Sequence, residues 1–208
     1  MADNGFPTLE IADKHVILLG DAILPDIGNL HEPLGPGFNG RLSLVSLKDM
    51  AEGNGLPDDA THAVICLEGN EAIAESGLLD GAPAPYRESL ARLSMAADAF
   101  EQMIEPLITT ALGAGLLTLV CTGFKPRYDD PQRQQAAVAA LAIFNERIIT
   151  RAVASRLSIV DLRLVVGHHE DFASATRLAP QGLGKAVSVI RRALDEADMG
   201  SIRTRVYI

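Results

Sequence analysis

The chain has 208 residues, of which 48% are hydrophobic and 22% charged, so it can bury a sizeable core and is not a disordered polar chain. Its net charge of -9, from 27 acidic and 18 basic residues, argues against nucleic acid as a partner, because binding to phosphates requires clustered cations. The first residues lack the cationic and apolar segments of a secretory signal, so we expect a cytoplasmic protein with an N-terminal extension at 1–14 and a single domain at 15–208.

Five short apolar runs predict β-strands, because they are rich in leucine and β-branched residues and most are bounded by turn residues. The predicted strands are residues 15–20, 41–47, 62–67, 116–121 and 157–162. Two of these runs contain Cys66 and Cys121, and a thiol in such a run behaves as a small buried hydrophobic group. We therefore expect neither a disulfide framework nor a cysteine metal site.

Longer segments with helical periodicity alternate with the strands. One helix is expected at about 86–112, where Pro106 should kink or divide it. Asp130 is a suitable cap for a second helix at 131–155, and a third is expected at about 181–197. This alternation is typical of βαβ units, so the predicted fold class is α/β, with a parallel sheet between two layers of helices.

One uncharged segment, at 107–124, approaches the length of a membrane span. Gly113 and Gly115 divide it into the end of a helix and a strand, so we expect no membrane partner. The stretch 22–40 contains several prolines and glycines, which make a long helix there unfavourable.

Ligands of an open parallel sheet bind beyond the carboxyl ends of its strands. We therefore expect the polar segments that follow four of the predicted strands to converge. These segments are Gly20–Ala22, Glu68–Glu71, Thr122–Lys125 and His168–Asp171.

Two of these segments lie in blocks that resemble the SGNH/GDSL hydrolases. Residues 15–22 resemble the opening block, in which Gly-Asp-Ser presents the nucleophile, and residues 56–72 resemble the block whose asparagine helps to form the oxyanion hole. The resemblance covers 15–208, and it implies an ester hydrolase with a flavodoxin-like three-layer α/β/α fold and five parallel strands in the order 2-1-3-4-5. Further blocks resemble a bacterial GDSL-like lipase/acylhydrolase subgroup in order and spacing, at 121–131, 141–145 and 161–165.

The resemblance also implies roles for residues at the strand ends. Ala22, after Asp21, stands at the nucleophile position, and a methyl group cannot attack a carbonyl carbon. Asn70, after Gly69, stands at the position of the oxyanion asparagine, and the backbone N–H of Ala22 would be a second donor. The family's glycine after the second strand has no counterpart before Gly53. Local capping of turns is the alternative role for Asp21 and Asn70.

The family's Asp-x-x-His pair near the C-terminus corresponds here to Ser174 and Arg177. The bacterial subgroup often lacks this histidine, so its absence here does not exclude an active enzyme. His168 or His169 is the candidate for a displaced base, because imidazole titrates near neutral pH, whereas solvated histidines on a polar loop are the alternative. A metal site that includes Asp171 lacks a distant ligand cluster, so we expect no metal and no cofactor.

Two arginines allow two interpretations. Arg127 and Arg163 are suited to bind an anionic ligand, but each lies near aspartates in the sequence. Structural ion pairs with Asp129, Asp130 or Asp161 are the more common arrangement.

Three functions remain open. The first is a catalytically impaired hydrolase-like protein that retains a cleft for a small ester-like ligand. The second is an active esterase or carbohydrate esterase, whose serine was replaced at Ala22 by engineering or whose base is displaced. The third is a non-catalytic interaction domain. A polar cleft favours ligand binding, whereas apolar side chains that fill the same volume favour a scaffold.

Overall fold

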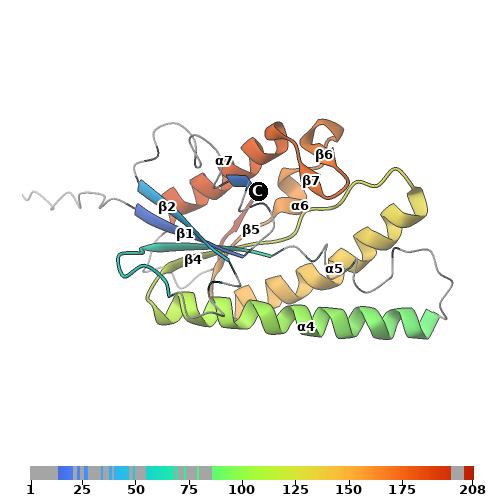
Figure 1. Cartoon of the computed structure of the whole chain (residues 1–208), viewed down its shortest axis with the longest axis horizontal. Helices are drawn as coiled ribbons and strands as arrows, with labels where there is room; N and C mark the ends of the chain where they lie inside the picture. The colour runs from blue at the N-terminus through green and yellow to red at the C-terminus, as the bar shows by residue number, and fades with distance from the viewer. Residues whose placement is uncertain are drawn as a thin grey trace, which may run out of the picture.

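A sheet of six parallel strands forms the centre of the part of the chain that the structure describes (Figure 1). This computed structural model describes residues 14–20, 23, 26–27, 34, 38, 40–46, 49, 55–67, 69, 73, 79, 86–197 and 204–208. The strands are β1 (Lys14–Gly20), β2 (Gly40–Val45), β3 (His62–Cys66), β4 (Leu117–Cys121), β5 (Ser158–Val160) and β8 (Val206–Tyr207).

The strand order is β2-β1-β3-β4-β5-β8, and each neighbouring pair is parallel. The first five strands therefore confirm the predicted order 2-1-3-4-5. The prediction of five strands was incomplete, because β8 extends the sheet beyond β5. A strand of two residues is too short to produce a periodic pattern in the sequence.

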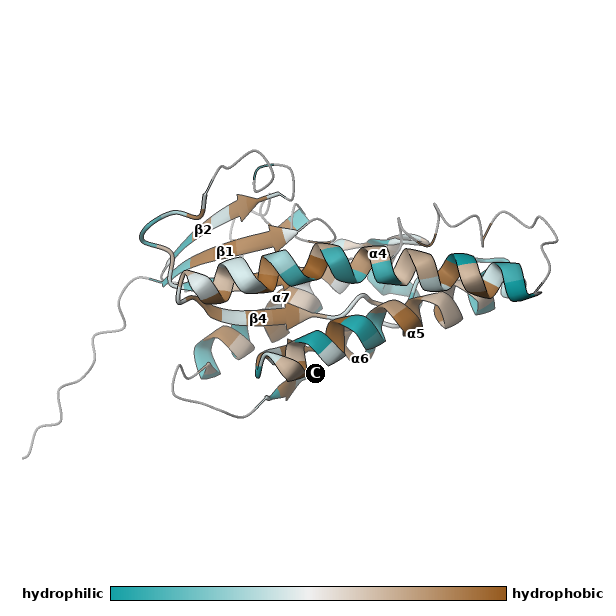
Figure 2. Ribbon diagram, turned by 90° about the horizontal axis from the view of Figure 1, so that it is seen from below, coloured by the Kyte–Doolittle hydropathy of each residue, from teal (hydrophilic) through white to brown (hydrophobic). Residues whose placement is uncertain are grey.

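Helices cover both faces of the sheet and complete three layers (Figure 1). The helices are α4 (Tyr86–Gly113), α5 (Pro131–Ala154), α6 (Leu162–Val165) and α7 (Pro180–Glu196). Side chains alternate along β1, so Ile17 packs in a core with α4 and α5, whereas Leu18 packs in a second core with α7. In Figure 2 the strands are mostly hydrophobic, whereas α4 and α5 carry polar residues between the apolar ones.

Helix α4 corrects one expectation, because it continues through Pro106 and is not divided there (Figure 1). Pro106 is exposed, so the carbonyl that loses its intrahelical hydrogen bond is on the solvent side of the helix. Helix α5 begins as predicted: Pro131 is in the first turn, and the Asp130 carboxylate accepts a hydrogen bond of 2.6 Å from the Arg133 N–H.

The segment between β5 and α7 contains structure that the sequence pattern did not indicate. Asp161 caps the short helix α6, so the predicted strand at 157–162 ends at Val160. A 3₁₀ turn, η1 (His169–Asp171), then leads into an antiparallel hairpin of β6 (Phe172–Ser174) and β7 (Arg177–Leu178).

Two further predictions concern the core and the membrane. Cys66 and Cys121 are buried in the core, as expected. Among the described helices, none is both long enough and apolar enough to cross a membrane. Most of the stretch 22–40 lies outside the described residues.

Candidate functional site

The carboxyl ends of β1, β3 and β4 are level, because Gly20 pairs with Cys66, and Cys66 pairs with Cys121. Gly20 has a φ of +120°, and a Cβ atom there would lie 2.3 Å from the Cys66 carbonyl oxygen. Only glycine allows this backbone conformation and this contact. The glycine of the opening block therefore brings the end of β1 directly against the end of β3.

Three predicted site residues, Asp21, Ala22 and Asn70, lie outside the described residues, so their roles stay predictions. Gly69 is described, and a Cβ atom at this position would lie 2.8 Å from the ring of Phe144. Close packing of the β3–α4 connection on helix α5 thus explains a glycine at position 69.

Buried polar side chains hold the segment that follows β4. Asn145 of α5 accepts a hydrogen bond of 2.8 Å from the Gly123 N–H and donates one of 3.0 Å to the Gly123 carbonyl. The Thr122 hydroxyl donates to Asp161 Oδ1 over 3.0 Å. Because these groups are buried, their hydrogen bonds fix the start of the β4–α5 loop relative to α5 and β5.

The two arginines singled out in the sequence have structural partners. Arg163 Nη2 lies 2.6 Å from Asp161 Oδ2, which makes the structural ion pair that we considered. Burial by itself would raise the pKa of Asp161, but hydrogen bonds from Arg163 and Thr122 lower it. Arg127 instead donates to the Gly167 carbonyl over 2.9 Å, and its backbone N–H donates to the Ala175 carbonyl over 2.7 Å. The β4–α5 loop is therefore tied to the segment that precedes α7.

Asp171 is fully buried, and its carboxylate has several hydrogen-bond donors. The N–H groups of Gly167 and His168 each donate to Oδ2 over 2.9 Å, and Lys185 Nζ lies 2.7 Å from Oδ1. Burial opposes ionisation, but these donors outweigh it and lower the pKa of Asp171 to about 2. The Asp171 side chain thus holds the turn η1 against α7.

Arg177, which we expected at the position of the family's histidine, faces the segment after β1. Its Nη2 atom lies 2.9 Å from Asp26 Oδ1. Ser174, which we expected at the position of the family's aspartate, pairs with Arg177 across the β6–β7 hairpin. An arginine stays protonated in proteins, so position 177 holds a permanent cation.

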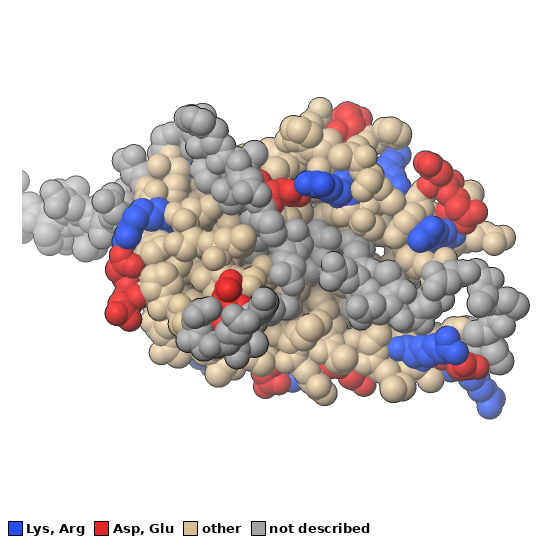
Figure 3. Space-filling model, in the orientation of Figure 1, with Lys and Arg blue, Asp and Glu red and all other residues tan. Residues whose placement is uncertain are grey.

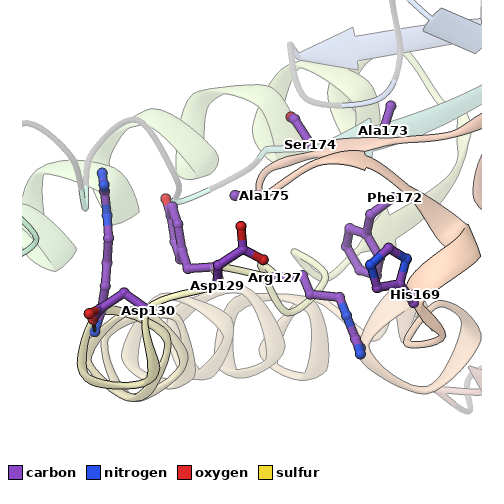
Figure 4. Close-up of a pocket in the computed structure, with 10 residues that line it drawn as sticks. Arg127, Asp129, Asp130, His169, Phe172, Ala173, Ser174 and Ala175 are labelled. Atoms are coloured by element: carbon purple, nitrogen blue, oxygen red, sulfur yellow. Dashed lines mark hydrogen bonds between the residues drawn. The ribbon is translucent and has the colours of Figure 1, made fainter.

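His168 and His169 are both exposed, as solvated loop histidines would be. His169 also lines a pocket of about 470 Å³ between the β4–α5 loop and the β6–β7 hairpin (Figure 4). Residues 127–130 and 133 form one side of the pocket, and residues 169 and 172–175 form the other. In Figure 4 the Asp129 carboxylate points toward Ala175, and the His169 ring lies beside Phe172.

The pocket has mixed charge, because two arginines and two aspartates line it. Arg133 covers the Tyr128 ring, with 4.6 Å between its guanidinium carbon and the ring centroid. On the face seen in Figure 3, Lys and Arg side chains likewise stand singly or beside acidic ones. Within the described ranges, no group of three or more His, Cys, Asp or Glu side chains is arranged to hold a metal ion.

The sequence pattern did not single out several residues of this pocket. Arg133 and Phe172 lay in no resembling block, and Tyr128 belonged to the block at 121–131 without a role of its own. The rule that ligands bind after the strands of a parallel sheet nevertheless pointed to the loop after β4. The hairpin that contributes Phe172 was not predicted, although His169 and Ser174 on the same side of the pocket had been singled out for other reasons.

Neither a protein-family model nor a curated protein matches the sequence. Solved structures do match the fold. An extracellular lipase from Streptomyces rimosus is 13% identical, with a TM-score of 0.61 over 89% of this chain and 100% of the lipase. A phospholipase A1 from Streptomyces albidoflavus is 12% identical, with a TM-score of 0.55 over 90% of this chain and 100% of the phospholipase. A GDSL-like lipase from Bacteroides thetaiotaomicron is 15% identical, with a TM-score of 0.53 over 88% of each chain. The chain therefore has the fold of the SGNH/GDSL hydrolases.

Proposed function

We propose that this chain is an SGNH-hydrolase-like protein whose serine-ester chemistry is impaired and which retains a cleft for a small ester-like ligand. The observation that carries the proposal is the ion pair between Arg177 and Asp26. The resemblance aligns Arg177 with the histidine that removes the proton from the family's nucleophile, so a cation held in an ion pair at this residue supports the proposed loss of the base.

The loss of the base agrees with the loss of the nucleophile. Acyl transfer through a serine requires an oxygen atom to attack the carbonyl carbon, and Ala22 has none. A guanidinium has no lone pair available at neutral pH, so Arg177 does not compensate as a general base. The nearby carboxylate of Asp171 is already engaged by Lys185 and two backbone N–H groups.

The pocket supports ligand binding over a purely structural role. Its volume of about 470 Å³ lies in the range of small-molecule sites, and its lining combines aromatic, cationic and anionic groups. Residues of the β4–α5 loop form part of it, beyond the carboxyl end of β4, where ligands of such sheets bind. An interaction domain without a cleft does not require this polar pocket.

One observation favours an active hydrolase with a displaced base as the second candidate. His169 is exposed and lines the pocket, and an imidazole there is a suitable general base. This candidate still requires an oxygen nucleophile, which Ala22 does not supply.

Restoring the two missing groups tests the proposal. We expect Ala22→Ser alone to hydrolyse p-nitrophenyl acetate weakly, and Ala22→Ser with Arg177→His to be about a hundredfold faster, because a general base contributes that much or more. Ala22→Gly is the matched control, since it changes the same position without adding oxygen. If Ala22→Ser alone reaches enzyme-like rates, or if His169→Ala abolishes the rate of that variant, the proposed loss of the base is wrong.

A further inference from the structure

A second cluster of polar side chains lies near the amino ends of the strands. His15 of β1 contacts Ser43 of β2 through Nε2, at 2.8 Å from the Ser43 hydroxyl oxygen. Its other ring nitrogen, Nδ1, lies 2.8 Å from Oδ1 of Asp59, in the turn before β3. A serine, a histidine and a carboxylate therefore form a continuous chain of hydrogen bonds that the proposed function does not use.

The local fold holds these three residues in place. In the parallel register Ser43 pairs with Ile17, and Ile17 is two residues from His15, so all three side chains lie on the same face of the sheet. The Thr61 N–H donates to the His15 carbonyl over 2.9 Å, and the His15 N–H donates to the Thr61 hydroxyl over 3.0 Å. These bonds hold the turn that contains Asp59 against β1.

The carboxylate of Asp59 determines how the imidazole is protonated. An ionised carboxylate only accepts hydrogen bonds, so the proton of neutral His15 is on Nδ1. Nε2 is then an acceptor, and the Ser43 hydroxyl donates its proton to it. This is the relation in which a histidine acts as general base toward a serine nucleophile.

Charge and burial keep the imidazole ready to accept a proton. His15 is only 4% exposed, and burial and then the nearby Arg41 lower its pKa. The side chain of Asp59 is 55% exposed and forms an ion pair with Arg41. Lys14 precedes His15 on β1 and points to the opposite face, where it lies near His62 and Asp195.

We propose that Ser43 is a nucleophilic serine that small activated acyl donors, such as thioesters and reactive esters, acylate. His15 is its general base, and Asp59 is the positioning residue for the imidazole. Ser43 Oγ forms a bond to the acyl carbon, and its proton passes to His15 Nε2. The C–S or C–O bond to the leaving group then breaks, and the leaving group takes the proton from Nε2.

The acyl group should remain on Ser43 rather than turn over. An alkyl ester of serine is a poorer acyl donor than a thioester or a p-nitrophenyl ester, because the serine alkoxide is a poorer leaving group, so deacylation should be slower than acylation. The site lies about 16 Å along β1 from Gly20, because Gly20 is the fifth residue after His15 in the strand. It is therefore distinct from the cleft at the carboxyl ends of the strands, and it does not depend on Ala22.

A fluorophosphonate probe tests the nucleophile directly, since Ser43 Oγ displaces fluoride from phosphorus as the proton moves to His15. The full chain is incubated with the probe, and peptide mass spectrometry locates the adduct. We expect a single adduct at Ser43 that is lost in Ser43→Ala and unchanged in Ser188→Ala, an exposed serine of α7. Incubation with p-nitrophenyl acetate should likewise leave about one acetyl group per chain on Ser43.

The role of the neighbours is tested by rate and by pH. We expect labelling about a hundredfold slower in Asp59→Asn, and similarly slow labelling in His15→Gln, because each change removes the oriented base. The rate in the unaltered chain should rise with pH and level off below the ordinary histidine pKa of about 6.5. Asp59 is half-exposed in a turn, so Asp59→Asn should fold. Its labelling rate therefore tests the role of the base even if His15→Gln fails to fold.

Two results would overturn the proposal. One is the absence of a Ser43 adduct in the folded chain, and the other is an equal labelling rate in the unaltered chain and Asp59→Asn. Ala22→Ser should not alter labelling at Ser43, so failure here leaves the proposed function of the other site unaffected.

Discussion

Arg177 and Asp26 form an ion pair of 2.9 Å that joins the β6–β7 hairpin to the segment after β1, although 151 residues separate them in the chain. The hairpin thereby brings position 177 beside the segment that follows the opening block.

This ion pair should contribute little to stability. The Arg177 side chain is 69% exposed, so water screens its attraction to Asp26. We expect Arg177→Ala to lower the free energy of unfolding by less than about 1 kcal/mol in urea denaturation. A loss above about 2 kcal/mol would contradict this interpretation and would indicate that the pair holds the hairpin in place.

Asp171 should contribute much more than Arg177. In Asp171→Asn the amide oxygen replaces only one carboxylate oxygen, so its NH2 group faces either Lys185 Nζ or the two N–H donors of Gly167 and His168. We expect a loss of about 3 kcal/mol in the free energy of unfolding, measured in urea. Asp129→Asn, at an exposed position of the neighbouring loop, is the control and should change stability by less than about 0.5 kcal/mol.

The lowered pKa of Asp171 also predicts that the protein loses stability in acid. Its pKa is lowered to about 2 in the folded chain, whereas an unfolded aspartate titrates near the ordinary value. The stabilisation is complete above about pH 4 and is lost as the pH falls toward 2, by roughly 2 kcal/mol. Unfolding measured at pH 5 and pH 3 should therefore show a larger loss for the unaltered chain than for Asp171→Asn. Equal losses in the two proteins would exclude this role for Asp171.

Gly20→Ala should destabilise the end of β1. The added Cβ atom would meet the Cys66 carbonyl oxygen, and alanine does not readily adopt a φ of +120°. We expect a loss of about 3 kcal/mol in thermal or urea unfolding. Gly113→Ala is a matched control, because a Cβ atom there would meet no atom within 4 Å, and it should be neutral or slightly stabilising. Similar values for the two variants would rule out a close approach of β1 and β3.

The clearest strand signals in the sequence belong to strands that are buried on both faces. β1 and β3 form continuous apolar runs, because helices cover both sides of the sheet. β8 has only two residues, and it is a strand because it pairs with β5 after α7. Such pairing arises only when the folded chain brings residues after α7 back beside β5, so the local sequence carries no pattern that predicts it.

The candidate site was predictable as a location but not as a set of interactions. The rule for parallel sheets pointed to the loop after β4, which lines the pocket (Figure 4). The partners of Asp171 and Arg177 were not predictable, because no spacing rule links Asp171 to Lys185 or Arg177 to Asp26. The cluster of His15, Ser43 and Asp59 was missed for the same reason, since its members come from two strands and a turn.

Steady-state hydrolysis of p-nitrophenyl acetate by the unaltered chain is the most direct test of impaired serine-ester chemistry. We predict no turnover above the rate without protein once any single equivalent of p-nitrophenol has been released. Sustained turnover at rates typical of enzymes, abolished by Asn70→Ala, would contradict the proposed function.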